Sequence, residues 1–238
     1  IASSDNKGVA ETVEGSIQKA LLRNCRFGFI AGGLDDRGVY GSLYESNQLQ
    51  YSPGLTAIIA ANQSRESLFE ALHQRSCYAT TGERIILGLQ VAGASMGKEI
   101  STTEKPGLLV NRHLTGYVAG TAPLTKVEVV RNGQVLQVFF PKHYSFDFSY
   151  DDMQPLDQVA MDAKDGKPPF VYYYLRVAQA DGHMAWSSPI WIDCIDWSKL
   201  PKPPVKRPPT KPAPSQAVPE LLQLFQGDDE ETDEEEDF

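Results

Sequence analysis

The dipeptide Asn132-Gly133, set between two runs of alternating apolar and polar residues, restricts the fold of this chain more than any other feature. The two runs are residues 127–131 and 134–138. Asn and Gly both tolerate a positive φ, which a two-residue hairpin turn requires at both positions. The period of two in the runs is that of a β-strand with one buried face. The sequence therefore predicts an antiparallel β-hairpin over residues 127–138.

A second turn of this kind, residues 180–182, lies between two further strand-like runs. The strands predicted besides the first hairpin are residues 85–91, 108–118, 145–150, 170–179 and 183–193. About seven short strands joined by regular turns indicate an antiparallel, immunoglobulin-like β-sandwich. The aromatic side chains of this region could form a sugar-stacking platform, but packing within the sandwich is the better interpretation. They include Tyr172, Tyr173, Tyr174, Trp186 and Trp191.

Upstream of the sandwich the apolar residues follow a helical period. Residues 11–24 predict an amphipathic helix. A second helix is expected to begin at Ser64, because its hydroxyl can accept a hydrogen bond from the first turn. Leu68, Phe69 and Leu72 recur on one side of this helix and predict its apolar face.

Two short apolar runs, residues 26–31 and 55–60, predict buried strands in the same part of the chain. With the helices they make two βα-like units, too few to close a barrel, which takes about eight. Residues 1–83 are therefore predicted to be a partial α/β segment, a barrel remnant. The sandwich domain is predicted to follow over residues 84–198.

The composition changes at residue 199. Residues 199–219 contain eight prolines and five basic residues, which predicts an extended linker. Residues 220–238 include nine acids within ten positions, and such a block of like charge predicts a disordered tail. The tail is interpreted either as a solubilising end or as a docking peptide for a protein partner. The contact residues of that peptide would be Leu221, Leu222, Leu224 and Phe225.

The charge balance argues against several classes of partner. The formal net charge is −9, and the nine acids of the tail account for all of it. The near-neutral remainder gives no electrostatic basis for binding nucleic acid or an anionic membrane, and no run of about 18 apolar residues predicts a membrane span. Three scattered cysteines predict neither a disulfide framework nor a zinc site. Because the chain begins at Ile1 rather than at Met, we expect a fragment or a processed chain.

A glycine-rich turn at residues 32–38 contains the candidate metal ligands, Asp35 and Asp36. They follow a predicted strand, and α/β folds place ligands at the carboxyl ends of strands. The alternative is an acidic, glycine-rich surface turn. The four histidines do not cluster by spacing into a further metal site, and surface or packing roles are expected for them. They are His73, His113, His143 and His183.

Several stretches of the chain resemble a family of bacterial proteins distantly related to the polymerase-and-histidinol-phosphatase (PHP) metallohydrolases and to carbaryl hydrolase. The stretches are residues 15–38, 54–59, 64–85, 96–97 and 172–193, which include the runs YATTG and SSPIWID. They resemble the C-terminal part of that family. The resemblance implies a barrel-like α/β catalytic domain followed by a β-sandwich. It also implies hydrolysis of phosphoester, ester or amide bonds with a divalent metal such as Zn, Mn or Mg.

The metal-binding pattern of that family is incomplete in this chain. Its Ser-Asp-x-His segment aligns so that Asp35 takes the aspartate position and Arg37 the histidine position, if one residue is inserted. Without the insertion, Leu34 and Asp36 take these positions. Both alignments lose the imidazole, whose nitrogen can bind a metal, and a guanidinium has no lone pair to offer. We therefore predict no catalytic residue in this chain and treat Asp35 and Asp36 as vestigial metal ligands.

Three hypotheses about function follow. The chain is the C-terminal segment of a metal-dependent hydrolase whose metal ligands lie mainly upstream, and it is inactive by itself. Alternatively, it is a non-catalytic binding or scaffold module that uses the sandwich and the acidic tail. In the third hypothesis, another chain completes it into an active enzyme. Clustered His and Asp motifs upstream of Ile1 would favour the first hypothesis over the second.

Overall fold

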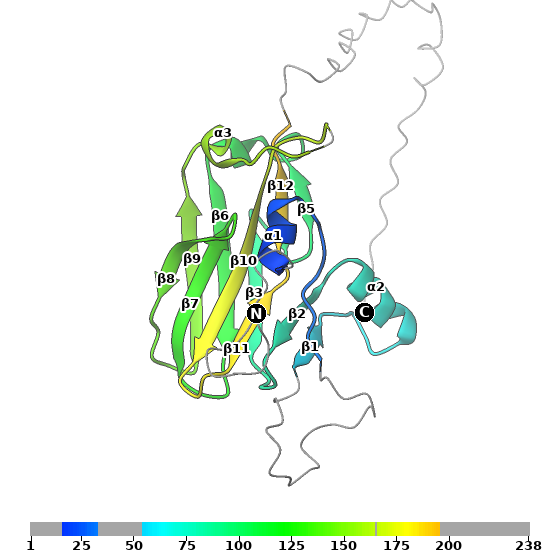
Figure 1. Ribbon diagram of the computed structural model, residues 1–238. Coiled ribbons are helices and arrows are strands. Elements are labelled where there is room, and N and C mark those ends of the chain that lie inside the picture. Colours follow the sequence, from blue (N-terminus) through cyan, green and yellow to red (C-terminus); the bar gives the residue numbers. More distant parts are fainter. Residues whose placement is uncertain (1–15, 33–53, 165, 196–238) are drawn as a thin grey trace, which may run out of the picture. The chain divides into compact units, whose positions relative to one another are not determined.

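Two mainly antiparallel β-sheets make up most of the computed structural model, which describes residues 16–32, 54–164 and 166–195 (Figure 1). These residues all belong to one compact unit, residues 1–199. The larger sheet contains β1 (Leu55–Ile58), β2 (Cys77–Thr80), β5 (Glu99–Ser101), β7 (Leu124–Arg131), β8 (Gln134–Phe139), β10 (Phe170–Gln179), β11 (Met184–Ser187) and β12 (Ile190–Asp193). The smaller sheet contains β3 (Ile86–Val91), β4 (Ala94–Ser95), β6 (Arg112–Ala119) and β9 (Ser145–Asp152). The helices are α1 (Ile17–Leu22), α2 (Arg65–His73), α3 (Leu156–Val159) and the 3-10 helix η3 (Pro106–Leu109).

Both predicted turns join paired strands. β7 and β8 meet at Asn132 and Gly133, whose φ angles are 52° and 78°. β10 and β11 meet through Gly182, at φ 86°. These positive φ values are the reason that Asn and Gly occupy the turns, and the two hairpins predicted from the sequence are confirmed.

Two of the strands predicted for the sandwich differ from the observed ones. The run 183–193 is split into β11 and β12 at Ser188-Pro189, because proline lacks the N–H that a continuous ladder needs. The run 108–118 begins as a strand only at Arg112, since residues 106–109 form η3, with Pro106 in its first turn. Both differences follow from proline, which the period-two pattern does not register.

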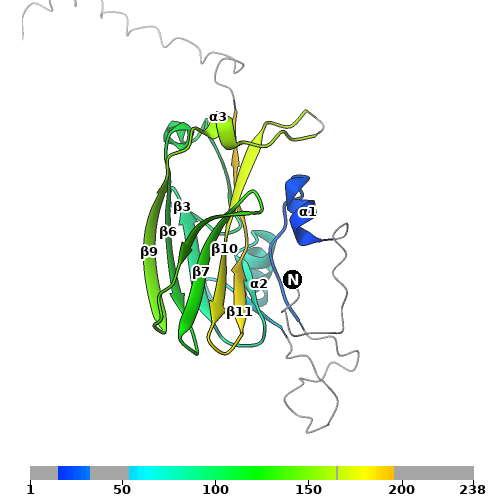
Figure 2. The same cartoon turned by 60° about the vertical axis from the view of Figure 1, so that its left-hand side comes forward.

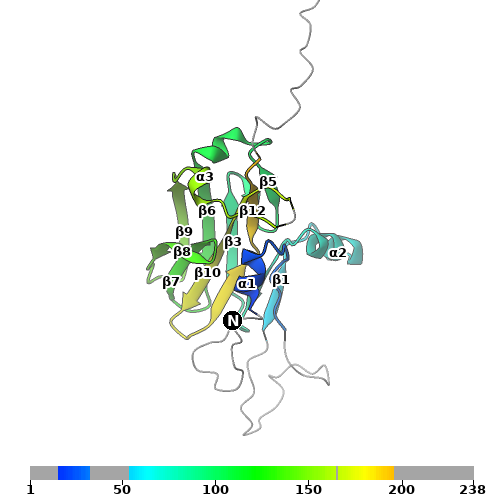
Figure 3. The same cartoon turned by 45° about the horizontal axis from the view of Figure 1, so that its top comes forward.

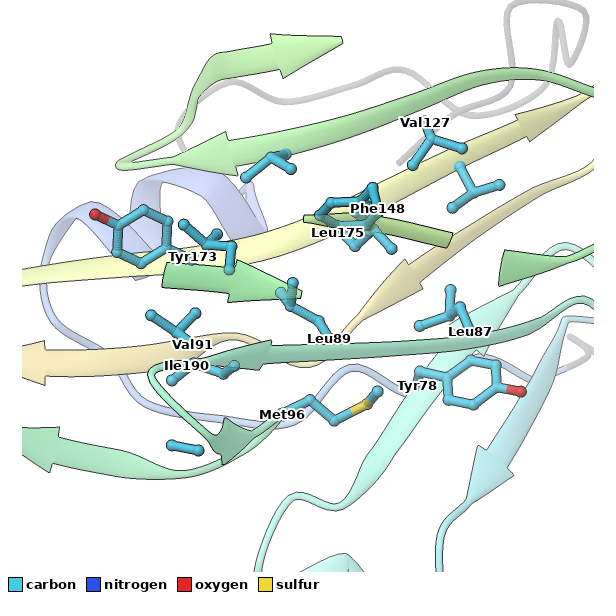
Figure 4. Close-up of a cluster of buried hydrophobic side chains, with 14 of the residues drawn as sticks. Tyr78, Leu87, Leu89, Val91, Met96, Val127, Phe148, Tyr173, Leu175 and Ile190 are labelled. Carbon is cyan, nitrogen blue, oxygen red and sulfur yellow. The ribbon is translucent and has the colours of Figure 1, made fainter. Parts of the chain in front are cut away.

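The main core lies between the two sheets (Figure 4). In β3 the buried residues Leu87, Leu89 and Val91 alternate with more exposed positions at both ends of the strand. They pack with Val127 of β7 and Leu175 of β10, which are also buried. The molecule is therefore a β-sandwich, as the alternating pattern predicted.

A second apolar layer covers the other side of the larger sheet (Figure 2). Leu21 of α1 and Phe29 pack there against Tyr172, Tyr174 and Trp191. The five aromatic residues considered for a sugar-stacking platform are therefore buried packing residues: Tyr172, Tyr173, Tyr174, Trp186 and Trp191. Because the larger sheet is covered on both sides, β10 is buried along nearly its whole length.

The segment predicted as a strand over residues 26–31 is not a strand. It runs extended over the larger sheet, and side-chain hydroxyls satisfy part of its backbone. The Phe29 N–H donates to Ser188 Oγ at 2.9 Å, and the Ala31 N–H donates to Thr56 Oγ1 at 3.0 Å. Thr56 Oγ1 in turn donates to the Ala31 carbonyl at 2.7 Å. The predicted helix 11–24 is described only from residue 16, where Ser16 caps the short helix α1.

The segment β1–α2–β2 joins the sandwich through its second strand. β1 and β2 are antiparallel, and β2 pairs with β11 in the register Trp186↔Ala79. The domain boundary predicted after residue 83 lies between β2 and β3. However, β2, on the N-terminal side of this boundary, lies in the same sheet as β11 of the predicted sandwich. Ser64 caps α2 as predicted, because its Oγ accepts from the Ser67 N–H at 3.2 Å.

Candidate functional site

The residues predicted as vestigial metal ligands, Asp35 and Asp36, lie outside the described residues, as do the tail residues from 196 to 238. Within residues 16–32, 54–164 and 166–195, no group of three or more His, Cys, Asp or Glu side chains could hold a metal ion. The same part of the chain has no helix that is long and apolar enough to cross a membrane.

Three histidines have side-chain partners in the structure, and the three lie in separate parts of it. His113 Nδ1 lies 2.8 Å from Asp151 Oδ1 on the exposed side of the smaller sheet. His183 Nδ1 lies 3.0 Å from Thr81 Oγ1, beside the β10–β11 turn. His73 stacks on Phe69 of α2. Each of these histidines contacts one polar or aromatic neighbour, which agrees with the surface and packing roles expected for the histidines.

Cys77 is the cysteine that is most deeply placed. Its side chain is buried, and Sγ lies 3.7 Å from Ser188 Oγ. Burial raises the pKa of the Cys77 thiol, and the contact with Ser188 only partly offsets this effect. A neutral, buried thiol is a packing group and not a nucleophile.

The first surface of functional interest is the outer side of α2, which lies beside β1 at the edge of the larger sheet (Figure 3). Ala71 is buried, whereas Phe69 and Leu72 are 68% and 42% exposed. The sequence predicts one apolar face that contains Leu68, Phe69 and Leu72. Leu68 is partly buried, but the other two point outward. In this chain, α2 therefore presents a large aromatic and a large aliphatic side chain to solvent.

The second feature of interest is a buried ionic cluster that links the two sheets, and its members were not predicted. Arg112 and Asp152 stand opposite each other on β6 and β9 and are 0% and 1% exposed. Arg112 Nη2 lies 3.0 Å from Asp152 Oδ1. From the larger sheet, the Tyr173 hydroxyl donates to Asp152 Oδ2 at 2.6 Å, and Arg131 Nη1 donates to the same oxygen at 2.7 Å.

This cluster keeps the Asp152 carboxylate ionised. Burial alone would raise the pKa of Asp152, but the bonds from Tyr173 and Arg131 and the charge of Arg112 outweigh burial and lower it. Burial and the adjacent Asp152 charge raise the pKa of Tyr173, which stays a neutral donor. The cluster thus holds two cations and one anion between the sheets.

Arg131 also borders a surface hollow of about 520 Å³ next to the β7–β8 turn. Its Nη2 donates to Gln154 Oε1 at 2.5 Å. The hollow is lined by Leu22, Arg131, Asn132, Gln134, Val135, Leu136, Gln154, Gln158, Val159 and Met161. Four of these ten side chains are carboxamides, five are apolar, and the remaining one is the Arg131 guanidinium.

A third group of charges fastens the outer layer to the sandwich. Arg26 Nη2 pairs with Asp193 Oδ1 at 2.5 Å, and Arg26 Nη1 pairs with Glu99 Oε2 at 2.5 Å. Arg75 reaches the same Glu99 carboxylate at 2.5 Å, and its guanidinium lies 5.3 Å from the centre of the Trp191 ring. The charges of these side chains pair with one another, which indicates a structural role.

Sequence comparison connects this chain to proteins of greater length. Residues 30–122 match the family described as "Protein of unknown function (DUF3604)". An uncharacterised protein of Chlamydia pneumoniae is 58% identical over 184 residues, which cover 77% of this chain and 30% of that protein. One of Chlamydia muridarum is 57% identical over 185 residues, with the same coverage of both chains. The chain therefore spans less than a third of the length of these relatives.

Structural comparison adds little to this. An engineered protein of known crystal structure is 11% identical to this chain, with a TM-score of 0.22. The match covers 47% of this chain and 20% of the engineered protein. A likeness at that score supports no assignment of fold or function. The sandwich is established by its own strand pairing instead.

Proposed function

We propose that this chain is the β-sandwich module of a longer metal-dependent hydrolase and docks through the outer side of α2 onto the α/β catalytic part of that protein. The observation that carries the docking is the exposure of Phe69 and Leu72 on one side of a capped helix. Support for a longer protein is the match to only 30% of the Chlamydia relatives. The hydrolytic activity rests on the resemblance to PHP-type enzymes.

Further exposed apolar residues lie beside or directly after β1, the strand that α2 contacts. Ile30 is 68% exposed, and Ile59, which directly follows β1, is 49% exposed. Burying such side chains against a partner stabilises by about 1.5–3 kcal/mol each, so this surface favours a docked state.

We further propose that the sandwich is immunoglobulin-like and that residues 1–83 are the remnant of an α/β domain. The two sheets packed face to face, with hairpins joining neighbouring strands inside the larger sheet, support the first proposal. The succession β1–α2–β2 supports the second, although its two strands are antiparallel. In this scheme the metal ligands belong to the longer protein, and Asp35 and Asp36 are vestigial.

Docking is tested by binding between this chain and the separately produced remainder of the Chlamydia pneumoniae relative, measured by titration calorimetry. Phe69→Ser with Leu72→Ser should weaken binding by roughly 30- to 700-fold, since each of the two side chains at the centre of an interface contributes about 1–2 kcal/mol. The matched control is Leu109→Ser with Val110→Ser, which changes two other exposed apolar residues and should leave the affinity unchanged. Equal affinities for all three proteins would refute docking through α2.

Hydrolysis is tested separately. The whole Chlamydia pneumoniae relative, supplied with manganese or zinc, should hydrolyse an aryl phosphate or aryl ester, and this chain alone should not. A whole protein that binds neither metal and hydrolyses neither substrate would favour the scaffold hypothesis. Hydrolysis by this chain alone, lost on changing Asp35 and Asp36 to Ala, would show that these carboxylates are active ligands.

A further inference from the structure

We propose that the hollow beside Arg131 binds a carboxylate with a short apolar, amide-bearing body, the chemistry of an acylated amino acid. This proposal is independent of docking through α2 and of hydrolysis. It rests on three properties of the hollow: its charge balance, its hydrogen-bond donors and its apolar lining.

The charge balance favours an anion. Asp152 is the shared counter-charge of Arg112 and Arg131, so the cluster has one positive charge in excess. Arg112 is fully buried, while Arg131 retains 15% of its side-chain exposure and borders the hollow. Of the ten described residues that line the hollow, Arg131 alone is charged. An incoming carboxylate would supply the missing counter-charge at a partly dry site, where an ion pair is stronger than in bulk water.

The donors suit a carboxylate in particular. A guanidinium has five N–H donors in a planar fork, and Arg131 uses one on Asp152 and one on Gln154. The remaining donors can bind the two oxygens of a carboxylate, whose planar geometry matches the fork. Gln134 and Gln158 are exposed carboxamides on the border of the hollow, and each offers a donor and an acceptor to an amide group of the ligand.

The lining explains why the ligand should carry an apolar body. Leu22 and Val135 are 47% and 43% exposed, and Leu136, Val159 and Met161 complete the apolar half of the wall. A volume of about 520 Å³ lies within the range of sites for small ligands. Inorganic phosphate would leave this apolar surface wet, so it is the less suitable anion.

The test is a titration of the full chain with N-acetyl-leucine, followed by two-dimensional NMR at low ionic strength. We expect saturable shifts of amide signals from the hollow, for example those of Val135 and Val159. The neutral analogue N-acetyl-leucinamide has the same body without the charge and should bind at least about tenfold more weakly, because charge-assisted bonds are roughly twice as strong as neutral ones. Inorganic phosphate should also bind more weakly than N-acetyl-leucine.

Two variants place a competing charge in the hollow and leave the four residues of the ionic cluster unchanged. Gln134→Glu and Gln158→Glu should each weaken binding of N-acetyl-leucine about threefold, the effect of a unit charge roughly 6 Å away in water. Gln90→Glu, on the exposed side of β3 in the smaller sheet, makes the same change outside the hollow and should have no effect.

Several results would overturn the proposal. No saturable shift at the hollow, or equal binding of the amide and the acid, would exclude a carboxylate site. Equal weakening by Gln90→Glu and by the two variants in the hollow would show that only the net charge matters. Tighter binding of phosphate than of N-acetyl-leucine would exclude a role for the apolar wall.

Discussion

Replacing Asp152 by asparagine should lower the free energy of unfolding by about 3–5 kcal/mol, the usual cost of removing one partner from a buried ion pair. The side chain is 1% exposed and accepts from Tyr173 and Arg131 while pairing with Arg112. Asparagine keeps one acceptor oxygen and turns the other side into a donor. Two guanidinium groups would then remain between the sheets without a counter-charge.

Urea denaturation measures this loss. For a unit of this size the midpoint temperature should also fall by roughly 6–20 °C, at about 2–4 °C per kcal/mol. The matched control is Asp151→Asn, one residue away on the same strand. Asp151 is 48% exposed and pairs with His113 at the surface, so this variant should leave the urea midpoint essentially unchanged.

A double-mutant cycle separates the ion pair from general damage. Arg112→Met alone and combined with Asp152→Asn should reveal a coupling energy of about 0.5–3 kcal/mol between the two positions. The reasoning fails if Asp152→Asn costs no more than Asp151→Asn. It also fails if the two changes at Arg112 and Asp152 add without coupling.

Two further outcomes concern the same sandwich. The pKa of Asp152 is lowered in the folded state, so its contribution to stability is complete above the unfolded value of about 3.9 and is lost as pH falls below it. Urea titrations of the wild type and of Asp152→Asn should therefore converge in acid. Gly93 and Gly97 both have positive φ, but only a Cβ at Gly97 would meet a backbone oxygen, that of Arg75, at 2.4 Å. By urea denaturation, Gly93→Ala should cost about 1–2 kcal/mol and Gly97→Ala a further 1–3 kcal/mol; equal costs would contradict the steric argument.

The parts of the fold that follow from local chemistry could be predicted from the sequence. Asn132-Gly133 fixes a hairpin because few other dipeptides adopt two successive positive φ angles. Ser64 marks the start of α2 because its hydroxyl satisfies a first-turn N–H. These signals act over a few residues and do not depend on the rest of the molecule.

The parts that depend on distant partners could not be predicted. Arg112 and Asp152 are separated by 40 positions in the sequence, and only the register of β6 on β9 brings them together. The apolar side of α2 that carries Phe69 could be predicted, but its exposure could not, because periodicity identifies an apolar side without showing what covers it. Both features, the ionic cluster and the exposed helix side, are those on which the proposed sites rest.

One stretch of the sequence indicates that the N-terminal segment packs on the sandwich. The run from Phe170 to Leu175 has no alternation between apolar and polar residues, which is the pattern of a strand covered on both sides. The smaller sheet covers one side of β10, so another element must cover the side that carries Tyr172 and Tyr174. Leu21 and Phe29 do so. Removing the N-terminal segment would expose a sheet of buried aromatic rings, so the outer layer is part of the folded module itself. An α/β partner would therefore dock not on these rings but on the exposed side of α2, beside β1 at the edge of the larger sheet.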